Sequence, residues 1–131
     1  MAYLLDTNIV SALLRDPHGK VYMRVLRAGP DRVATSAIVV SELRYGFRRK
    51  YSKLALRLEP LLSSLKIHPF QAPADERYGE IRAHLEKIGK LIGPNDLLIA
   101  AHALALNSAV VTDNEREFSR VPGLKVENWL R

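Results

Sequence analysis

The fold of this chain is decided by the stretch Tyr3-Leu4-Leu5-Asp6-Thr7-Asn8-Ile9-Val10. A short apolar run ends in a carboxylate there, and an amphipathic segment begins at once. A buried strand followed by a helix has this pattern, and it delivers the acid to the carboxyl edge of a sheet. Open α/β sheets bind their ligands at that edge.

Apolar runs alternate with helical segments along the rest of the chain, which requires crossover connections and predicts an α/β fold. We expect a central, twisted, parallel sheet of four to five short strands flanked by helices. No repeat, low-complexity tract or linker interrupts residues 1–131, so a single domain is predicted. The expected strands are Tyr3–Leu5, Val33–Thr35, Ile67–Phe70, Ala109–Thr112 and Lys125–Val126. The expected helices are Thr7–Leu14, Val21–Ala28, Ser36–Lys50, Lys53–Leu65, Asp75–Lys90 and Leu97–Leu106.

Composition narrows the class of protein. At 47% apolar, the 131 residues can bury a proper core. No apolar run approaches the roughly 20 residues of a membrane span, and the start lacks the pattern of a secretory signal. The absence of cysteine excludes disulfides, thiolate metal sites and cysteine nucleophiles. These features fit a cytoplasmic protein.

The chain is basic, with 20 Lys and Arg against 14 Asp and Glu, a net charge of +6. A small basic protein indicates a polyanionic partner, most commonly nucleic acid, although charge that serves only solubility is the alternative. Basic residues concentrate just after Glu42. We predict that four of them hold a phosphate backbone, although a solvated helix face would look similar. These residues are Arg44, Arg48, Arg49 and Lys50.

Two more acids, Glu42 and Asp96, lie in predominantly apolar stretches like that of Asp6. Each acid alone has a structural explanation, because Asp6 and Asp96 can cap helices and Glu42 can lie on a helix surface. Three carboxylates that meet in one crevice repel each other. A bound hard divalent cation such as Mg²⁺ or Mn²⁺ would offset this repulsion. A water activated by that cation can hydrolyse a phosphodiester without a Ser, Cys or His nucleophile.

Further oxygen ligands follow the expected strand Ala109–Thr112. They are Asp113, Asn114 and Glu117. Thr7 and Asn8 either orient waters of the metal or simply belong to the first helical turn. The four histidines show no zinc spacing, and His102 is expected to be packed rather than catalytic. Glycine motifs of nucleotide-binding loops are absent.

Four motifs in order resemble those of the PIN-domain ribonucleases, most closely the VapC toxins of toxin–antitoxin pairs. They are Leu5-Asp6-Thr7-Asn8, Ser41-Glu42-Leu43-x-x-Gly46, Asn95-Asp96-Leu97-Leu98-Ile99-Ala100-Ala101 and Val111-Thr112-Asp113-Asn114-x-x-Glu117-Phe118. The resemblance extends over nearly the whole chain, to Val126-Glu127-Asn128-Trp129.

The resemblance implies a Mg²⁺-dependent endoribonuclease in which Asp6, Glu42 and Asp96 are the core acids, with Asp6 and Asp96 the most direct metal ligands. Many relatives carry an Asp where this chain has Asn114, so either Asp113 or Glu117 supplies the fourth charge, or that corner is neutral.

The resemblance also implies partners. They are an RNA substrate, in close relatives the anticodon loop of initiator tRNA, and a VapB-type antitoxin whose tail enters the acidic groove. The toxin is expected to be a homodimer that joins a larger toxin–antitoxin assembly, which contacts operator DNA through the antitoxin.

Two other functions compete with this interpretation. A phosphatase of the haloacid-dehalogenase type, or another acid-based phosphoryl hydrolase, would need a second acid two positions after Asp6, where this chain has Asn8. In a non-catalytic nucleic-acid-binding module, the acids would only cap helices. Such a module would show no Mg²⁺-dependent turnover.

Overall fold

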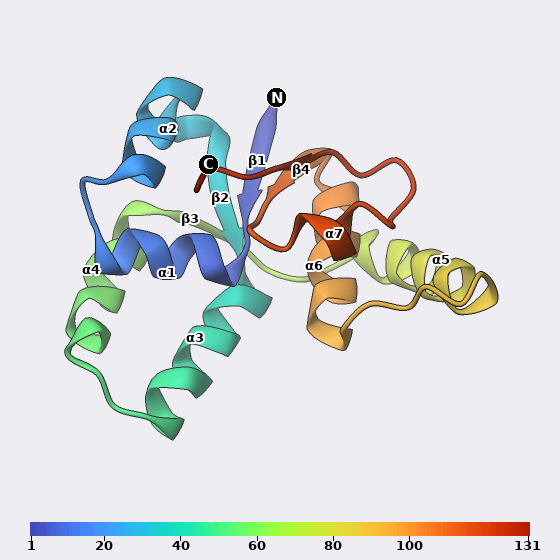
Figure 1. The fold of residues 1–131 in the computed structure, drawn as a ribbon, viewed down its shortest axis with the longest axis horizontal. Helices are drawn as coiled ribbons and strands as arrows, with labels where there is room; N and C mark the ends of the chain where they lie inside the picture. Colours follow the sequence, from blue (N-terminus) through green and yellow to red (C-terminus); the bar gives the residue numbers. More distant parts are fainter.

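A sheet of five parallel strands forms the centre of the protein in the computed structural model, which describes residues 1–131 (Figure 1). Its order is β3-β2-β1-β4-β5, with Leu5 in register with Thr35 on one side and Val111 on the other. The predicted α/β class and parallel sheet are therefore confirmed. The strands are β1 (Ala2–Leu5), β2 (Val33–Ser36), β3 (Lys66–His68), β4 (Ser108–Val111) and β5 (Val126–Glu127).

Helices cover both faces of the sheet, with α1 to α4 on one side and α5 to α7 on the other (Figure 1). The α-helices are α1 (Thr7–Arg15), α2 (Lys20–Ala28), α3 (Ala37–Arg49), α4 (Leu58–Ser64), α5 (Ala74–Lys87), α6 (Pro94–Ala105) and α7 (Glu115–Phe118); the 3-10 turns are η1 (Pro30–Arg32) and η2 (Lys53–Arg57). Because β3 connects to β4 across the sheet, the winding reverses between β1 and β4. Ligand crevices of α/β sheets open at such a reversal.

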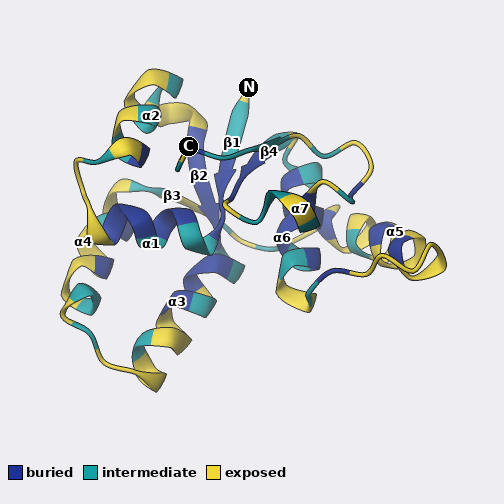
Figure 2. Ribbon diagram, viewed as in Figure 1, coloured by how far each residue is buried: buried dark blue, intermediate teal, exposed yellow.

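The core follows from the apolar strands at the centre of the sheet. Leu4 and Leu5 of β1 and Val110 and Val111 of β4 are fully buried, as parallel strands with helices on both faces require (Figure 2). Trp129 closes the end of the chain, with its ring centroid 5.1 Å from that of Tyr3. The rigid centre of the sheet thus fixes the residues that follow β1 and β4.

Two predicted segments, one helix and one strand, have different bounds in the structure. The predicted helix Lys53–Leu65 was wrong as a continuous element, because η2 and α4 divide it. Pro60 lacks the backbone N–H that a longer helix would need at that position. The strand predicted over Ile67–Phe70 ends at His68, before Pro69, and lies at the sheet edge, where proline is tolerated.

The two helices on the opposite face also begin or end elsewhere. Helix α5 ends at Lys87 because Gly89 has a φ of +69°, and Ile88 is 46% exposed rather than a core residue. Helix α6 begins at Pro94, which suits a first helical position, so Asp96 lies inside the first turn rather than before the helix. No helix of the structure combines the length and the apolar character that crossing a bilayer requires.

Candidate active site

Asp6 follows β1 directly and is only 3% exposed. It caps α1, since its Oδ1 accepts a hydrogen bond from the Thr7 backbone N–H at 2.8 Å. Its Oδ2 accepts from the Thr112 hydroxyl at 2.7 Å and from Asn8 Nδ2 at 3.3 Å. Burial raises the pKa of Asp6, while the bonds from Thr112 and Thr7 oppose the rise. The capping role is therefore real, but it uses only one of the two oxygens.

Glu42 lies on α3 and contacts the beginnings of two other helices. Its Oε1 accepts a hydrogen bond from the Thr7 hydroxyl at 2.7 Å, and its Oε2 accepts from Asn95 Nδ2 at 3.1 Å. The side chain is half-buried. Glu42 is thus directed to the crevice rather than to open solvent, and its charge raises the pKa of both Asp6 and Asp96.

Asp96, in the first turn of α6, is the acid that its neighbours perturb most clearly. Its pKa is raised to about 7, chiefly by burial, then by the charge of Asp6, a hydrogen bond and charge from Glu117, and the charge of Glu42. Its Oδ2 also accepts a hydrogen bond from Asn114 Nδ2 at 3.0 Å. Four carboxylates, from four different helices or helix starts, therefore interact at one edge of the sheet.

The structure separates the two candidates for the fourth acid. Glu117, on α7, lies beside Asp96. The exposed Asp113 has its carboxylate directed away, to Asn128 Nδ2 at 3.0 Å, while its backbone N–H donates to Asn8 Oδ1 at 2.9 Å. Only Glu117 of this pair joins the acidic group.

Two polar residues support the acids without having been singled out by the sequence. Thr112 donates to Asp6 and accepts from the Asn114 backbone N–H at 2.9 Å, and Asn95 donates to Glu42. The signal for Thr112 was available, because the register of β1 and β4 places the residues after Leu5 and Val111 side by side. Nothing in the local pattern marks Asn95, whose contact depends on how α3 and α6 approach each other.

The oxygen atoms of these residues suit a hard divalent cation, although no three Asp, Glu or His side chains are already arranged to coordinate one. Mg²⁺ commonly uses one or two carboxylates and keeps several waters, so a cage of three protein ligands is not required. The raised pKa of Asp96 reflects burial and unrelieved repulsion, both of which a cation would offset. All the atoms that could bind the cation are oxygens, which Mg²⁺ and Mn²⁺ prefer as ligands.

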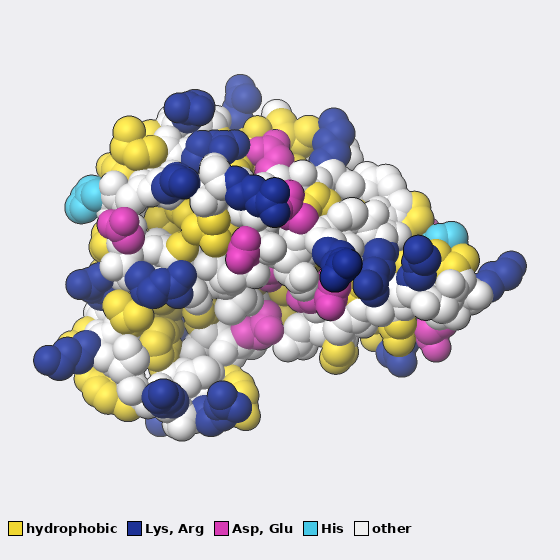
Figure 3. Space-filling view, viewed as in Figure 1, with side chains coloured by type: hydrophobic (Ala, Val, Ile, Leu, Met, Phe, Trp, Pro, Cys, Tyr) yellow, Lys and Arg dark blue, Asp and Glu magenta, His cyan; other side chains and the backbone are white.

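The four basic residues after Glu42 divide between two faces of α3. Arg49 and Lys50 line a hollow of about 530 Å³ that also includes Thr7 and Glu42. Arg44 and Arg48 line a separate hollow, where Arg44 forms an exposed ion pair of 2.6 Å with Glu59. Basic side chains surround the far end of α3, and acidic ones lie nearer the middle of this face (Figure 3).

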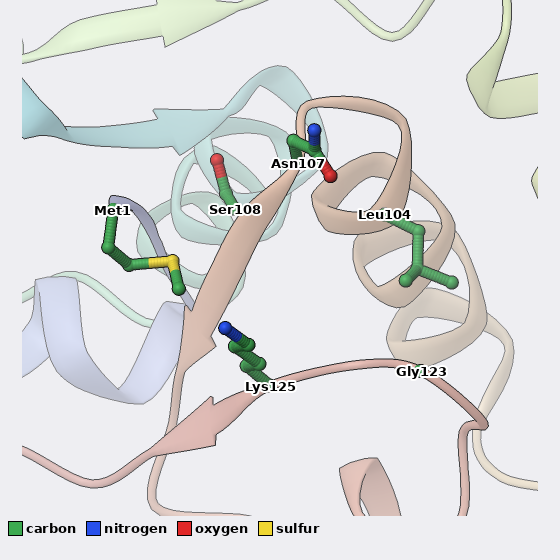
Figure 4. A pocket seen from close by; sticks show the side chains of 6 residues that line it. All are labelled: Met1, Leu104, Asn107, Ser108, Gly123 and Lys125. Atoms are coloured by element: carbon green, nitrogen blue, oxygen red, sulfur yellow. The ribbon is translucent and has the colours of Figure 1, made fainter.

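A further hollow of about 310 Å³ lies at the opposite, amino edge of the sheet (Figure 4). Its lining residues are Met1, Leu104, Asn107, Ser108, Gly123 and Lys125. None of the acids described above contributes to it. This hollow is therefore separate from the acidic site.

His102 is packed, as expected from the sequence. It is 2% exposed, and its Nδ1 lies 2.8 Å from the Ser36 hydroxyl. Phe70 and His68 contact the ring edge-on. Ser36 caps α3, the helix that carries Glu42. His102 therefore supports the start of that helix through its contact with Ser36.

Comparison with known proteins places these features in a family. A model of the PIN domain matches residues 3–124. The chain is 44% identical over 132 residues to Ribonuclease VapC2 of Rickettsia felis, and 33% identical to the tRNA(fMet)-specific endonuclease VapC of Salmonella typhimurium, with 98% of each chain covered in both cases. The crystal structure of VapBC2 from Rickettsia felis bound to a DNA fragment from their promoter matches with a TM-score of 0.87 and 41% identity, over 98% of this chain and 99% of that one.

Proposed function

Because the chain belongs to the PIN-domain family and is of the VapC type, we propose that it is an endoribonuclease toxin that hydrolyses RNA phosphodiester bonds with a bound Mg²⁺ or Mn²⁺. The observation that carries this proposal is the group of four acids at the reversal point of the sheet. Relatives named as ribonucleases match the chain over 98% of its length, which supports the same reaction class.

The acids take different roles in this proposal. Asp6 and Asp96 would hold the cation, with Glu42 and Glu117 completing the negative environment around it. When bound, the cation supplies charge neutralisation at the scissile phosphate and lowers the pKa of water. The chain holds both acids in position: hydrogen bonds from Thr7 and Thr112 fix Asp6, and Asn114 orients Asp96.

We further propose that a VapB-type antitoxin binds and neutralises this toxin in the cytoplasm. The similar structure from Rickettsia felis is a VapBC2 complex bound to a promoter DNA fragment, which supports both the antitoxin and a complex that contacts its operator. A tRNA anticodon loop is the proposed substrate, on the support of the tRNA(fMet)-specific relative from Salmonella typhimurium.

The test is to incubate the purified protein and Mg²⁺ with total RNA and to map the new 5′ ends by sequencing. We expect cuts at one or a few positions, and we expect the cognate antitoxin to suppress them. Asp6→Asn provides the matched control, because it keeps the size of the side chain and removes its charge. RNA that stays intact with the wild-type protein, or equal cutting by Asp6→Asn, would overturn the proposal.

A further inference from the structure

Tyr45 is an exposed aromatic residue in the hollow that begins at the acids. It lies three positions after Glu42 on α3, so both side chains share one face of the helix. Its exposed fraction is 65%, and it lines the 530 Å³ hollow together with Thr7, Glu42 and Arg49. An aromatic ring thus stands in water close to the proposed reaction centre.

Three of the five tyrosines have a packing role that Tyr45 lacks. Tyr3, Tyr22 and Tyr78 pack against the hydrophobic core. Tyr45 and Tyr51 are 65% and 67% exposed, and both lie at the far half of α3 or just beyond it. Only Tyr45 lines the hollow that contains Glu42. Packing therefore explains three tyrosines and leaves Tyr45 without a structural role.

The charges around Tyr45 indicate what would cover it. Along α3, Glu42 comes before Tyr45, and Arg49 and Lys50 come after it at the end of the helix; all four line the hollow. A nucleic-acid strand that reaches the acids from this side would meet the two cations at its phosphates, with a base level with the ring. An exposed ring between an acid and two cations along the helix offers a surface for a base and charges for phosphates, which are the two parts of a nucleotide.

We propose that Tyr45 stacks against the base of an unpaired nucleotide next to the scissile phosphate, while Arg49 and Lys50 hold neighbouring phosphates. This inference rests on the proposed ribonuclease function and assigns one residue of its substrate site. Aromatic stacking requires a free base face, which a nucleotide inside a duplex does not offer. Tyr45 therefore selects unpaired RNA with little regard to base identity, since every base has a π-face.

The experiment measures RNA binding separately from cleavage. Fluorescence anisotropy gives the Kd of a short single-stranded RNA and of the same sequence in a duplex, both in an Asp96→Asn background that prevents cutting. Tyr45→Leu removes the ring, Tyr45→Phe keeps it, and Tyr51→Leu is the matched control for an exposed tyrosine outside the hollow. We expect about a tenfold loss of single-strand affinity for Tyr45→Leu, and less than about a twofold change for Tyr45→Phe, Tyr51→Leu and the duplex.

Three results would overturn the inference: unchanged single-strand affinity of Tyr45→Leu, an equal loss with Tyr45→Phe, or an equal loss for the duplex. Weakened binding of the antitoxin alone would assign Tyr45 to that partner and also overturn it. The proposed function has its own readout, cleavage of total RNA by the unmodified protein. Cleavage that persists while Tyr45→Leu binds normally would remove only the stacking role.

Discussion

The hydroxyl of Thr7 donates a hydrogen bond of 2.7 Å to Oε1 of Glu42, which lies 35 positions later in the sequence. The backbone N–H of the same threonine donates to Oδ1 of Asp6. One residue therefore contacts two acids from different parts of the chain. Thr7 sets the position of Glu42 relative to the sheet, although its own side chain carries no charge.

Replacing this hydroxyl should impair cleavage without unfolding the protein. We expect Thr7→Val to lower kcat about 10- to 100-fold, because residues that orient metal-binding carboxylates commonly have effects of this size. Thr7→Ser retains the hydroxyl and should stay within about threefold of the wild type, allowing for its extra rotamer freedom. Single-turnover cleavage with circular dichroism of each variant provides the measurement. Equal rates for Thr7→Val and the wild type would show that this bond does not matter for activity.

Asp96→Asn should abolish cleavage and stabilise the metal-free protein at neutral pH. The pKa of Asp96 is raised from 3.8 to about 7, so the stabilising contribution of its protonated form is fully present below pH 3.8 and is lost as pH rises through 7. The variant lacks this titration. Its advantage in free energy of unfolding should thus grow from about pH 4 to pH 7 and then level off. Because the side chain is half-exposed, we expect about 1 kcal/mol rather than the full value of the pKa shift.

Urea denaturation in EDTA at several pH values measures this difference. The exposed Asp75→Asn on α5 is the matched control and should show no such trend. A variant that is less stable than the wild type at every pH would contradict the idea that repulsion and burial strain Asp96.

Much of the site could be predicted because Asp6 directly follows a strongly patterned strand and Asp96 lies in the first turn of a strongly patterned helix. The apolar run before Asp6 predicts β1, and alternation predicts the parallel sheet, so the shared edge follows from topology. The choice between Asp113 and Glu117 could not be made this way. Both follow β4 within six residues, and the contact of Asp113 with Asn128 depends on how the end of the chain folds back.

The basic residues show a second limit of sequence patterns. Their spacing places all four on one helix. The partner of Arg44, however, is Glu59 of α4, which lies in a predicted helix that the structure divides between Arg57 and Leu58. The face of α3 that η2 and α4 cover depends on tertiary packing, which the local sequence does not predict.

The two pairs of basic residues should therefore differ in RNA binding. Neutralising Arg49 and Lys50 together, by Arg49→Gln and Lys50→Gln, should weaken RNA affinity and reduce the slope of log K against log salt by about 1.4, two single-strand phosphate contacts. Neutralising Arg44 and Arg48 together should change the slope little, since Arg44 is paired with Glu59. The cut position should stay the same in all variants. Identical slopes for the wild type and the Arg49, Lys50 double variant would exclude phosphate contacts by that pair.

His102 should stabilise the fold in a pH-dependent way. Burial, and then the charge of His68, lower its pKa below the ordinary 6.5, so its contribution is present above pH 6.5 and is lost as pH falls through the lowered value. We expect His102→Ala to cost about 3 kcal/mol at pH 7.5, from the lost ring and its bond to Ser36. The gap to the wild type should narrow below pH 6.5, whereas the exposed His84→Ala should match the wild type throughout. A constant gap across pH 5 to 8 would contradict a neutral, buried His102.

Metal removal with add-back tests whether the four acids act through a bound divalent cation. RNA cleavage by the purified protein is measured in excess EDTA, and again after Mg²⁺ or Mn²⁺ is restored, with Asp6→Asn in parallel. We expect no cleavage in EDTA, full recovery with either ion, and no recovery for Asp6→Asn. Cleavage that continues undiminished in excess EDTA would show that the acids act without a metal.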